Sequence, residues 1–570
     1  MEPRSTRLRA LVLGLLALAC TAGFVACGGG SSSSGSGGGT GGGTGGGTGG
    51  GTGGGTGGGG TGGTPGSPTD ITTYKYNVAR TGANTTETLL TVANVNQATF
   101  GKLRFLSTNG RVDAQPLYLS GLTVQGAKHN VLFVVTESDM VYAFDVDTGG
   151  VLWQSSVLPA NETTDDQPPY GCDQVYPQIG ITSTPVIDRS AGANGTIYLV
   201  AMSKSTADNT YHQRIHALDV TTGAAVLPAT DITASYPNLG GTTTFDPGQY
   251  EDRAALLLSQ GVIYTTWTSH CDVPPYTGWI IGFSQQTLAR TSVLNVAPNS
   301  SGSGPAIWMA GGGPAADTDG SIFLATANGA FETALDANGF PNQQDYGNSF
   351  LRLTPVSGSL TVTDYFTMYN VTAEVAKDED LGSGGVVLLP DATDAGGTVR
   401  HLAVAGGKDG TMYVVERNSM GKFSSGGNNN YQSLAGALGG GIWSTPAYFN
   451  GSVYYGPTNG TLRSFRMSQG LFPATPTSES SHTYQYPGTA PSVSANGTSD
   501  AIVWTHENTN PGVLHAHDAA DLTHELYNSS QAANGRDQFG AGNKFITPVV
   551  ADGKVFVGTT DGVAVFGLLN

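Results

Sequence analysis

Residues 131–153 read VLFVVTESDMVYAFDVDTGGVLW, and this stretch decides the fold. Two apolar runs flank a short polar turn, and Asp-Val-Asp-Thr-Gly-Gly leads into a third run that ends at Trp153. Such runs, bounded by turn residues, predict three consecutive antiparallel strands. The aspartate can accept hydrogen bonds from its own turn, and Gly149 suits a backbone conformation that other residues avoid. A calcium loop would need more oxygen ligands and a distal glutamate, so we expect a turn here.

The pattern recurs along the chain, giving eight copies in all. The other copies lie at 195–227, 261–294, 320–366, 401–423, 451–472, 501–527 and 553–569. A short apolar strand, often opening with proline, precedes each of the eight copies, at 114–121, 183–188, 253–261, 312–320, 384–391, 444–451, 490–497 and 546–553. Four antiparallel strands repeated radially around a channel make a β-propeller.

The last copy lacks an outer strand of its own. Residues 100–110, FGKLRFLSTNG, precede the first inner strand and can supply it, which leaves no open sheet edge. The sequence therefore predicts an all-β chain: an eight-bladed β-propeller of four-stranded antiparallel blades, closed by an N-terminal strand. We assign it to residues 67–570 and expect a monomer.

The first 66 residues have the composition of a targeting signal followed by a flexible linker. Residues 1–27 combine a basic start with an apolar run, typical of a lipoprotein-type signal peptide. Small residues precede both Cys20 and Cys27, as in the lipobox of bacterial lipoproteins. We expect Cys27 to carry the lipid, because the Gly/Thr/Ser-rich linker at 28–66 follows it directly. The protein would then be exported and lipid-anchored in the bacterial cell envelope, in the periplasm or at the outer membrane or cell surface. The alternative is an ordinary cleaved signal with an incidental cysteine.

Composition narrows the class of protein. Of 570 residues, 85 are glycine and only 12 % are charged, which favours turns and strands over long helices. The formal net charge of −18 argues against a nucleic-acid partner, since binding phosphates requires a basic surface.

Two copies carry a family resemblance. YAFDVDTGGVLW (142–153) and HALDVTTGAAVL (216–227) resemble the pyrroloquinoline-quinone-type repeat. Residues 75–570 are similar to the quinoprotein alcohol-dehydrogenase-like superfamily, within it the uncharacterised bacterial secreted and lipoprotein members. The resemblance implies an eight-bladed propeller. The enzymes of the superfamily hold an acidic planar quinone and calcium at the axis, with a tryptophan, an arginine and an aspartate base.

The cysteines separate this chain from many of those enzymes. Many have a disulfide between adjacent cysteines, and some have a Cys-x-x-Cys-His haem site. Here the cysteines are at 20, 27, 172 and 271 only, so neither signature is present and no haem is expected.

The loops that precede the inner strands should meet at one rim of the channel. Together they collect Asp113, Gln178, Glu251, Arg253, Trp308, Asp380, Trp443, Arg536, Asp537 and Lys544. The tryptophans could stack on a planar ligand, and the cations could pair with its carboxylates. Candidate cofactor-binding residues are Gln178, Arg253, Trp308, Trp443 and Lys544. Asp380 and Asp537 are candidates for a catalytic base or a cation ligand.

Two functions fit this rim. The first is a platform that binds a small molecule or an envelope protein. The second is a pyrroloquinoline-quinone- and calcium-dependent dehydrogenase of an alcohol or sugar. The missing cysteine pair and haem motif favour the first. Polar groups at a wet channel mouth also cap strand ends and bridge blades, so the residues alone leave a purely structural role open.

The histidines offer a weaker signal. His515 and His517 alternate on one strand face, with His506 and His524 nearby. No third ligand is visible at metal spacing, so we expect packing histidines and predict no metal site.

Cys172 and Cys271 remain once the signal and lipid cysteines are set aside. Both lie in loops expected at the same rim of the propeller, and an exported lone pair usually bonds. The sequence predicts a disulfide between them, with two reduced thiols as the alternative.

Overall fold

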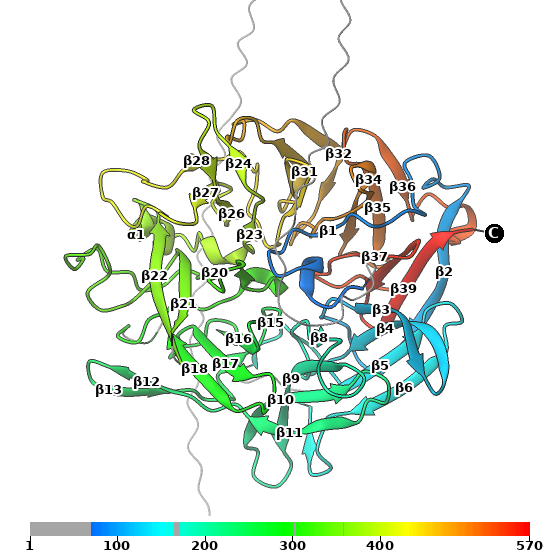
Figure 1. Ribbon diagram of the computed structural model, residues 1–570, viewed down its shortest axis with the longest axis horizontal. Coiled ribbons are helices and arrows are strands. Elements are labelled where there is room, and N and C mark those ends of the chain that lie inside the picture. Colours follow the sequence, from blue (N-terminus) through cyan, green and yellow to red (C-terminus); the bar gives the residue numbers. More distant parts are fainter. Residues whose placement is uncertain (1–69, 165–170, 301, 303, 357, 570) are drawn as a thin grey trace, which may run out of the picture. The chain divides into compact units, whose positions relative to one another are not determined.

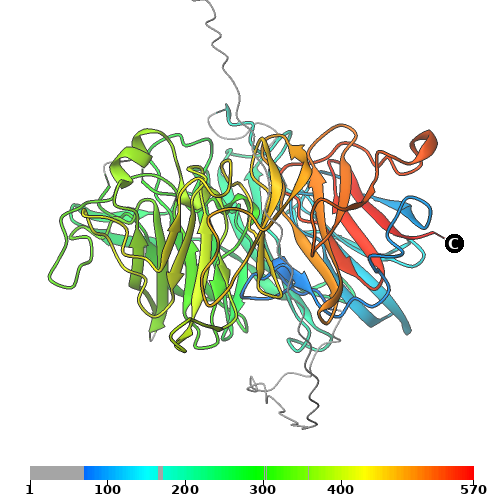
Figure 2. The ribbon, with the colours of Figure 1, turned by 90° about the horizontal axis from the view of Figure 1, so that it is seen from above.

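The structure is a computed structural model that describes residues 70–164, 171–300, 302, 304–356 and 358–569, all within one compact unit, Gly62–Asn570. The signal peptide at 1–27, the linker at 28–66 and Cys27 lie outside the described residues. Eight sheets surround a common axis as the blades of a β-propeller, seen down the axis in Figure 1 and from the side in Figure 2. The predicted fold class is confirmed.

Each blade has four antiparallel strands that follow one another outward from the axis. Blades 1 to 4 consist of β3 (Leu117–Val124), β4 (Ala127–Val135), β5 (Met140–Asp145) and β6 (Val151–Ser156); β8 (Val186–Asp188), β9 (Thr196–Ser205), β10 (Tyr211–Asp219) and β11 (Ala225–Asp231); β15 (Leu257–Ser259), β16 (Val262–Ser269), β17 (Trp279–Ser284) and β18 (Arg290–Asn295); β19 (Ala315–Ala316), β20 (Ile322–Ala325), β21 (Ser349–Val356) and β22 (Ser359–Thr367).

The second half of the ring continues in the same order. Blades 5 to 8 consist of β23 (Val387–Leu388), β26 (Leu402–Gly406), β27 (Met412–Glu416) and β28 (Gln432–Leu434); β29 (Ala447–Phe449), β30 (Ser452–Tyr455), β31 (Gly460–Arg466) and β32 (Ser478–Tyr484); β33 (Ser492–Asn496), β34 (Ser499–Glu507), β35 (Val513–Asp518) and β36 (Glu525–Asn528); β37 (Val549–Ala551), β38 (Lys554–Gly558), β39 (Gly562–Leu568) and β2 (Phe100–Ser107).

Short elements decorate the blades. They are β7 (Glu162–Thr163) beside β9, β14 (Tyr250–Glu251) beside β16, the hairpins β12 (Ser235–Asn238)–β13 (Gly241–Thr244) and β24 (Ala392–Thr393)–β25 (Val399–Arg400), the helix α1 (Val371–Ala376), and the 3-10 turns η3 (Met309–Gly311), η4 (Leu381–Ser383) and η5 (Ala533–Gly535). Among the described residues, no helix combines the length and the apolar character needed to cross a bilayer.

The N-terminal strand closes the ring. Strand β2 pairs antiparallel with β39, from Phe100 opposite Leu568 to Ser107 opposite Gly562. The Phe100 ring is buried and stacks on Phe566 with the ring centroids 6.3 Å apart. Residues from both ends of the propeller sequence therefore share blade 8, as predicted, and no blade edge at the closure is left unpaired.

The repeated Asp-x-x-Thr-Gly motif is a turn between the third and fourth strands. Asp145 Oδ1 accepts hydrogen bonds from the backbone N–H groups of Asp147 and Thr148, at 2.8 and 3.0 Å. Asp219 does the same in blade 2. The carboxylate thus caps its own turn, as the sequence predicts.

The motif also joins neighbouring blades. Trp153 at the end of the first copy packs on Gly223 of the second, whose φ is +69° and where an added Cβ would lie 2.5 Å from the indole Cε3. The indole N–H donates to the Val220 carbonyl at 3.0 Å. Glycine is required there both for the turn and for the close approach of the tryptophan.

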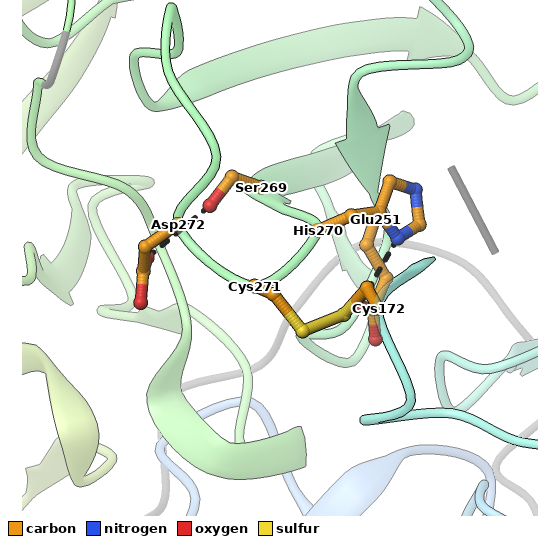
Figure 3. The surroundings of a disulfide bond; sticks show 6 residues. All are labelled: Cys172, Glu251, Ser269, His270, Cys271 and Asp272. Carbon is orange, nitrogen blue, oxygen red and sulfur yellow. Dashed lines mark hydrogen bonds and ion pairs between the residues drawn. A yellow bond between two sulfur atoms is a disulfide. The ribbon is translucent and has the colours of Figure 1, made fainter. Parts of the chain in front are cut away.

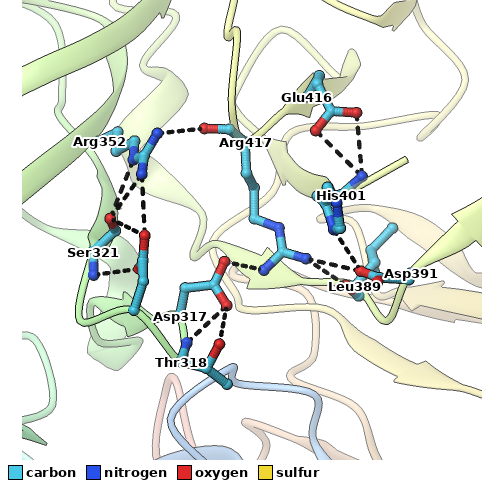
Figure 4. A network of polar contacts seen from close by, with 10 residues as sticks. Asp317, Thr318, Ser321, Arg352, Leu389, Asp391, His401, Glu416 and Arg417 are labelled. Atoms are coloured by element: carbon cyan, nitrogen blue, oxygen red, sulfur yellow. Dashed lines mark hydrogen bonds and ion pairs between the residues drawn. The ribbon is translucent and has the colours of Figure 1, made fainter. Parts of the chain in front are cut away.

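Charged side chains link blades 4 and 5 (Figure 4). Arg417, which directly follows β27, is buried and donates to the Asp317 carboxylate of blade 4 and to the Leu389 carbonyl of its own blade. Arg352 of blade 4 donates to the Arg417 carbonyl at 3.4 Å. Each blade therefore holds the other through hydrogen bonds in both directions.

Residues 71–85 run through the centre of the ring and were not predicted to do so. The 3-10 turn η1 (Tyr74–Tyr76) lies inside the ring of blades in Figure 1, and β1 (Ala83–Asn84) pairs in parallel with β33. Hydrogen bonds join this segment to a residue in or beside the inner strand of every blade: Tyr118, Ile187, Leu256, Ala316, Leu388, Tyr448, Val493 and Val550. We call residues 71–85 the central segment.

Two cations of the central segment are fully buried. Lys75 Nζ donates to the Pro491 carbonyl, and burial lowers the pKa of Lys75 to about 7. The Arg80 guanidinium donates to the carbonyls of Pro314, Leu256 and Tyr74 at 2.9, 3.0 and 3.0 Å. Buried charge is costly unless it is hydrogen-bonded, so these contacts fix the segment against the surrounding inner strands.

Candidate functional site

A pocket of about 340 Å³ opens at the mouth of the channel. It is formed by the loops that precede inner strands, together with hairpin loops that reach the same rim. Its lining residues are Gln174, Val175, Glu251, Arg253, Asp272, Trp308, Ala310, Asp378, Asp380, Ser383, Lys408, Trp443, Tyr486, Lys544 and Phe545. The central segment is a separate feature, hydrogen-bonded to residues in or beside the inner strands of all eight blades.

Five of the seven predicted site residues line this one pocket. They are Arg253, Trp308, Asp380, Trp443 and Lys544. These five residues meet because the loops that precede the inner strands converge at one rim of the channel, as the repeat predicts. Their roles in binding or catalysis stay predictions.

Gln178 and Asp537 do not line the pocket. The Gln178 amide donates to Ser138 Oγ in the turn of blade 1. Asp537 is fully buried and accepts hydrogen bonds from the Tyr527 hydroxyl at 2.7 Å and from Arg536 Nε at 2.8 Å. Its carboxylate also accepts the Lys102 backbone N–H of β2, so it fastens blade 8 and does not face the axis. Sequence position alone could not separate residues in these loops that point inward from those that point into a blade.

Two half-buried tryptophans belong to the pocket wall. Trp308 precedes blade 4 and packs partly on the apolar core between blades 2 and 3. Trp443 precedes blade 6, and the edge of its ring meets Tyr486 with the centroids 5.5 Å apart. The Asp380 loop, which precedes blade 5, lies between them in the order of the ring. Each indole thus has one supported side and some surface left for a ligand.

Cations gather around the phenyl ring of Phe545. The Arg253 guanidinium carbon lies 4.9 Å from the ring centroid and Lys544 Nζ lies 5.6 Å from it. Arg253 is 3 % exposed, its Nη1 lies 3.4 Å from Asp113 Oδ1, and its Nη2 has no hydrogen-bond partner among the described residues. Burial, and then the charges of Arg253 and Arg111, lower the pKa of Lys544. This wall therefore offers positive charge and a spare donor to an anion.

Lys408 and Asp380 form an ion pair on another wall. Lys408 Nζ lies 2.7 Å from Asp380 Oδ2 and 2.8 Å from Asp378 Oδ2. Asp380 Oδ1 accepts the Asn328 backbone N–H at 2.8 Å. Burial raises the pKa of Asp380, and Lys408 opposes that shift. Lys408 was not among the predicted site residues, because it lies in the β26–β27 turn and not in a loop before an inner strand, yet it lines the same pocket.

Glu251 lies in the pocket beside His270 (Figure 3). It is 1 % exposed, and neither carboxylate oxygen has a hydrogen-bond partner among the described residues. Burial raises its pKa to about 7. His270 Nδ1 lies 3.8 Å from Glu251 Oε2, but burial lowers the pKa of His270 to about 4, so the imidazole is neutral near pH 7. Burying a carboxyl group without hydrogen bonds costs free energy. A buried carboxyl with a raised pKa is therefore characteristic of binding and catalytic sites.

The disulfide between Cys172 and Cys271 borders the pocket (Figure 3). The two Cα atoms lie 5.4 Å apart, and the predicted pairing is confirmed. Val175, three residues beyond Cys172, and Asp272, next to Cys271, both line the pocket. The bond therefore joins two loops at the mouth, as the sequence analysis expected.

Backbone strain accumulates at the same place. Ala310 and Phe545 line the pocket and have φ values of +46° and +68°, in the left-handed region that residues with a Cβ seldom adopt. Such conformations persist where the surroundings over-determine them, and they cluster at functional sites.

Comparison with known proteins identifies the fold. No family model matches the chain, and no curated protein matches it in sequence. Among solved structures, a quinohemoprotein alcohol dehydrogenase from Comamonas testosteroni is 14 % identical, over 88 % of this chain and 80 % of that one, with a TM-score of 0.56. A second one, from Pseudomonas putida HK5, is 12 % identical over the same shares, with a TM-score of 0.55. A europium-containing methanol dehydrogenase is 14 % identical, over 88 % of this chain and 98 % of that one, with a TM-score of 0.56.

This chain shares its eight-bladed propeller fold with quinoprotein dehydrogenases. At such low identity the likeness establishes the fold alone, and the function has to be argued from the pocket.

Proposed function

We propose that this quinoprotein-type propeller is a binding protein whose channel-mouth pocket holds a small, planar, anionic molecule. The observation that carries the proposal is the combination of half-buried Trp308 and Trp443 with Arg253 and Lys544 in one pocket that also holds an unpartnered Glu251. The pocket volume of about 340 Å³ falls within the range of about 300–1,000 Å³ that is usual for small-molecule sites. A flat aromatic ring would stack on the indoles, and its carboxylates would meet the cations.

The test uses pyrroloquinoline quinone, a planar tricarboxylate, as the probe. We expect saturable binding of one molecule per chain in equilibrium dialysis. Trp443→Ala should weaken this binding by about 5- to 150-fold, since ring stacking and burial together stabilise by ~1–3 kcal/mol. Tyr369→Ala, which removes an aromatic side chain that is 53 % exposed and outside the pocket, is the matched control. Failure of the wild-type protein to bind the probe, or equal binding by Trp443→Ala, would overturn the proposal.

The binding should depend on pH through Glu251. Because its pKa is raised to about 7, the carboxyl is neutral below that pH and negatively charged above it. Affinity for an anionic probe should therefore fall as the pH rises through about 7, by up to about tenfold if the interaction is worth one pKa unit. His270, with its pKa near 4, stays neutral over this interval.

Glu251→Gln serves as the control for this pH effect. Because glutamine does not ionise, any pH dependence of binding that this variant retains comes from the probe or from other groups. The difference between the wild-type and variant pH profiles therefore measures the effect of Glu251. Identical pH profiles for the two proteins would contradict the role given to Glu251.

A quinone-dependent dehydrogenase is the second candidate. The residues fit such a group: the cations suit its carboxylates, the indoles suit its ring, and Glu251 with Asp380 supplies oxygen atoms for calcium. Bound there, the quinone would supply a two-electron acceptor. Asp380, held by Lys408 and Asn328, is the residue that could take a proton from a substrate hydroxyl.

Turnover distinguishes the two candidates. A dehydrogenase loaded with quinone and calcium should reduce an artificial dye when alcohols or sugars are added, and Asp380→Asn should lose that activity while still binding the probe. Probe binding without any dye reduction would favour the binding protein. Capture of an envelope protein that competes with the probe would instead make the mouth a protein-binding surface.

Attachment to the bacterial cell envelope through lipid on Cys27 is part of the proposal. It is supported by the apolar run, the small residues before Cys27 and the linker that follows. Changing Cys27 to alanine should move the protein from the membrane fraction to the soluble envelope fraction. A Cys27→Ala protein that stays in the membrane fraction, with release by Cys20→Ala instead, would place the lipid on the other cysteine.

A further inference from the structure

Two histidines and a glutamate from neighbouring blades converge at one point. His482 lies on β32 of blade 6, and Glu507 and His515 lie on β34 and β35 of blade 7. Nε2 of His482 lies 3.0 Å from Glu507 Oε1, and Nε2 of His515 lies 2.7 Å from the same oxygen. The ligand atoms of the three residues all lie within 4.8 Å of one another.

These distances suit a tetrahedral metal ion. Around zinc with bonds of ~2.0–2.1 Å, neighbouring donor atoms lie ~3.3 Å apart, so each imidazole nitrogen needs to move away from the glutamate oxygen by only a few tenths of an ångström. The two imidazole rings are also held in place. They stack with their centroids 4.7 Å apart. The Tyr484 ring packs at a steep angle against both, with its centroid 4.8 Å from that of His482 and 5.6 Å from that of His515. These contacts hold the rings while both Nε2 atoms lie beside the same Glu507 oxygen, so the ligand atoms are gathered before any metal arrives.

The second nitrogen of His515 has the partner that metal-binding histidines usually have. His515 Nδ1 lies 2.7 Å from Glu525 Oε1 on β36. Asn528 in turn donates to the same carboxylate oxygen at 3.3 Å. A carboxylate on the far nitrogen fixes the tautomer and orients the ring so that Nε2 can bind metal.

Charge favours a divalent cation at this point. Glu507 and Glu525 both lie 2.7 Å from the fully buried His515 ring, so two carboxylates face one imidazole. A cation of charge +2 bound to Nε2 of His515 would neutralise both. The site is also accessible, because the His482 side chain is 34 % exposed and that of Glu507 is 13 % exposed.

We propose that His482, Glu507 and His515 form a zinc-binding site between blades 6 and 7, with Glu525 orienting His515 and a fourth position open to water. Two histidines and a glutamate are an established ligand set for zinc sites that keep an open position. The proposal does not depend on the channel-mouth pocket. His517 is not included, because both of its ring nitrogens already have partners: Nδ1 lies 3.2 Å from the Leu522 carbonyl and Nε2 lies 3.4 Å from the Tyr484 hydroxyl.

This site was not predictable from the sequence, where His515 and His517 share one strand and no third ligand stands at nearby spacing. The third ligand, His482, comes from the outer strand of the preceding blade and meets blade 7 only because neighbouring blades pack face to face. No local spacing carries that information.

The test titrates chelator-treated full-length protein with Zn²⁺ by calorimetry and with Co²⁺ by visible absorption. We expect one metal ion per chain and the absorption of tetrahedral Co²⁺. His482→Ala, a partly exposed change that should leave the fold intact, should lose both signals. Glu525→Gln should weaken zinc binding by about 10- to 100-fold, because it removes only the orienting partner.

His524→Ala is the matched control, because its side chain is 60 % exposed and lies outside the cluster. It should bind zinc as the wild-type protein does, and zinc should raise the melting temperature of both but not of His482→Ala. Absence of stoichiometric zinc binding, or retention of it in His482→Ala, would overturn the proposal. Equal loss in His524→Ala and His482→Ala would do the same.

Discussion

Replacing Arg80 by alanine is expected to lower the free energy of unfolding by about 3–5 kcal/mol. The guanidinium is 0 % exposed and donates to the carbonyls of Pro314, Leu256 and Tyr74 and to Thr73 Oγ1. The change leaves a cavity at the axis and removes a donor from buried carbonyls near the inner strands of blades 3 and 4. Denaturant unfolding measures the loss.

The comparison for Arg80 is Lys377→Ala. The Lys377 side chain is 64 % exposed and its ammonium lies 3.5 Å from Glu379 Oε2, so its removal should change stability little. If Arg80→Ala unfolds at the same denaturant concentration as Lys377→Ala, the central segment does not stabilise the ring in the way described here.

The second large effect concerns the disulfide. A Cys172→Ser/Cys271→Ser double variant should be destabilised by up to about 4–5 kcal/mol, because the bond closes a loop with a sequence separation of 99 residues and so restricts the unfolded chain. Because Val175 and Asp272 beside the two cysteines line the pocket, the variant should also bind the quinone probe more weakly.

Reduction provides the internal control for this prediction. A reductant should lower the stability of the wild-type protein to that of the double variant and should leave the double variant unchanged. A double variant as stable as the oxidised wild-type protein would contradict the stabilising role. Unchanged probe affinity would show that the bond does not shape the pocket.

The repeat made the fold readable from sequence. Each blade is specified locally by alternating strands and by the Asp-x-x-Thr-Gly turn, so eight copies give eight blades. The closing strand at 100–110 was predictable for a different reason: blade 8 lacked an outer strand, and an unpaired edge is unfavourable.

The pocket was readable only in part. Arg253, Trp308, Asp380, Trp443 and Lys544 meet because their loops occupy equivalent positions in the repeat. Gln178 and Asp537 occupy equivalent loops as well, yet they turn toward blade packing, and that choice depends on partners such as Ser138 and Tyr527 that are distant in the chain.

The central segment and the histidine cluster lay beyond sequence reasoning. Residues 71–85 belong to no repeat, and their hydrogen bonds reach inner strands spread over the whole propeller. Lysine and arginine usually lie at the protein surface, but Lys75 and Arg80 are both buried in the central segment. Their cost of burial is offset by hydrogen bonds, mainly to carbonyls of distant residues.

The most direct test of the central claim is a crystal structure of the protein grown with pyrroloquinoline quinone at a saturating concentration. We expect density for one quinone at the channel mouth, with its ring against Trp443 or Trp308 and its carboxylates near Arg253 and Lys544. Density for the quinone anywhere else on the propeller, or a pocket that holds only solvent at saturation, would contradict it.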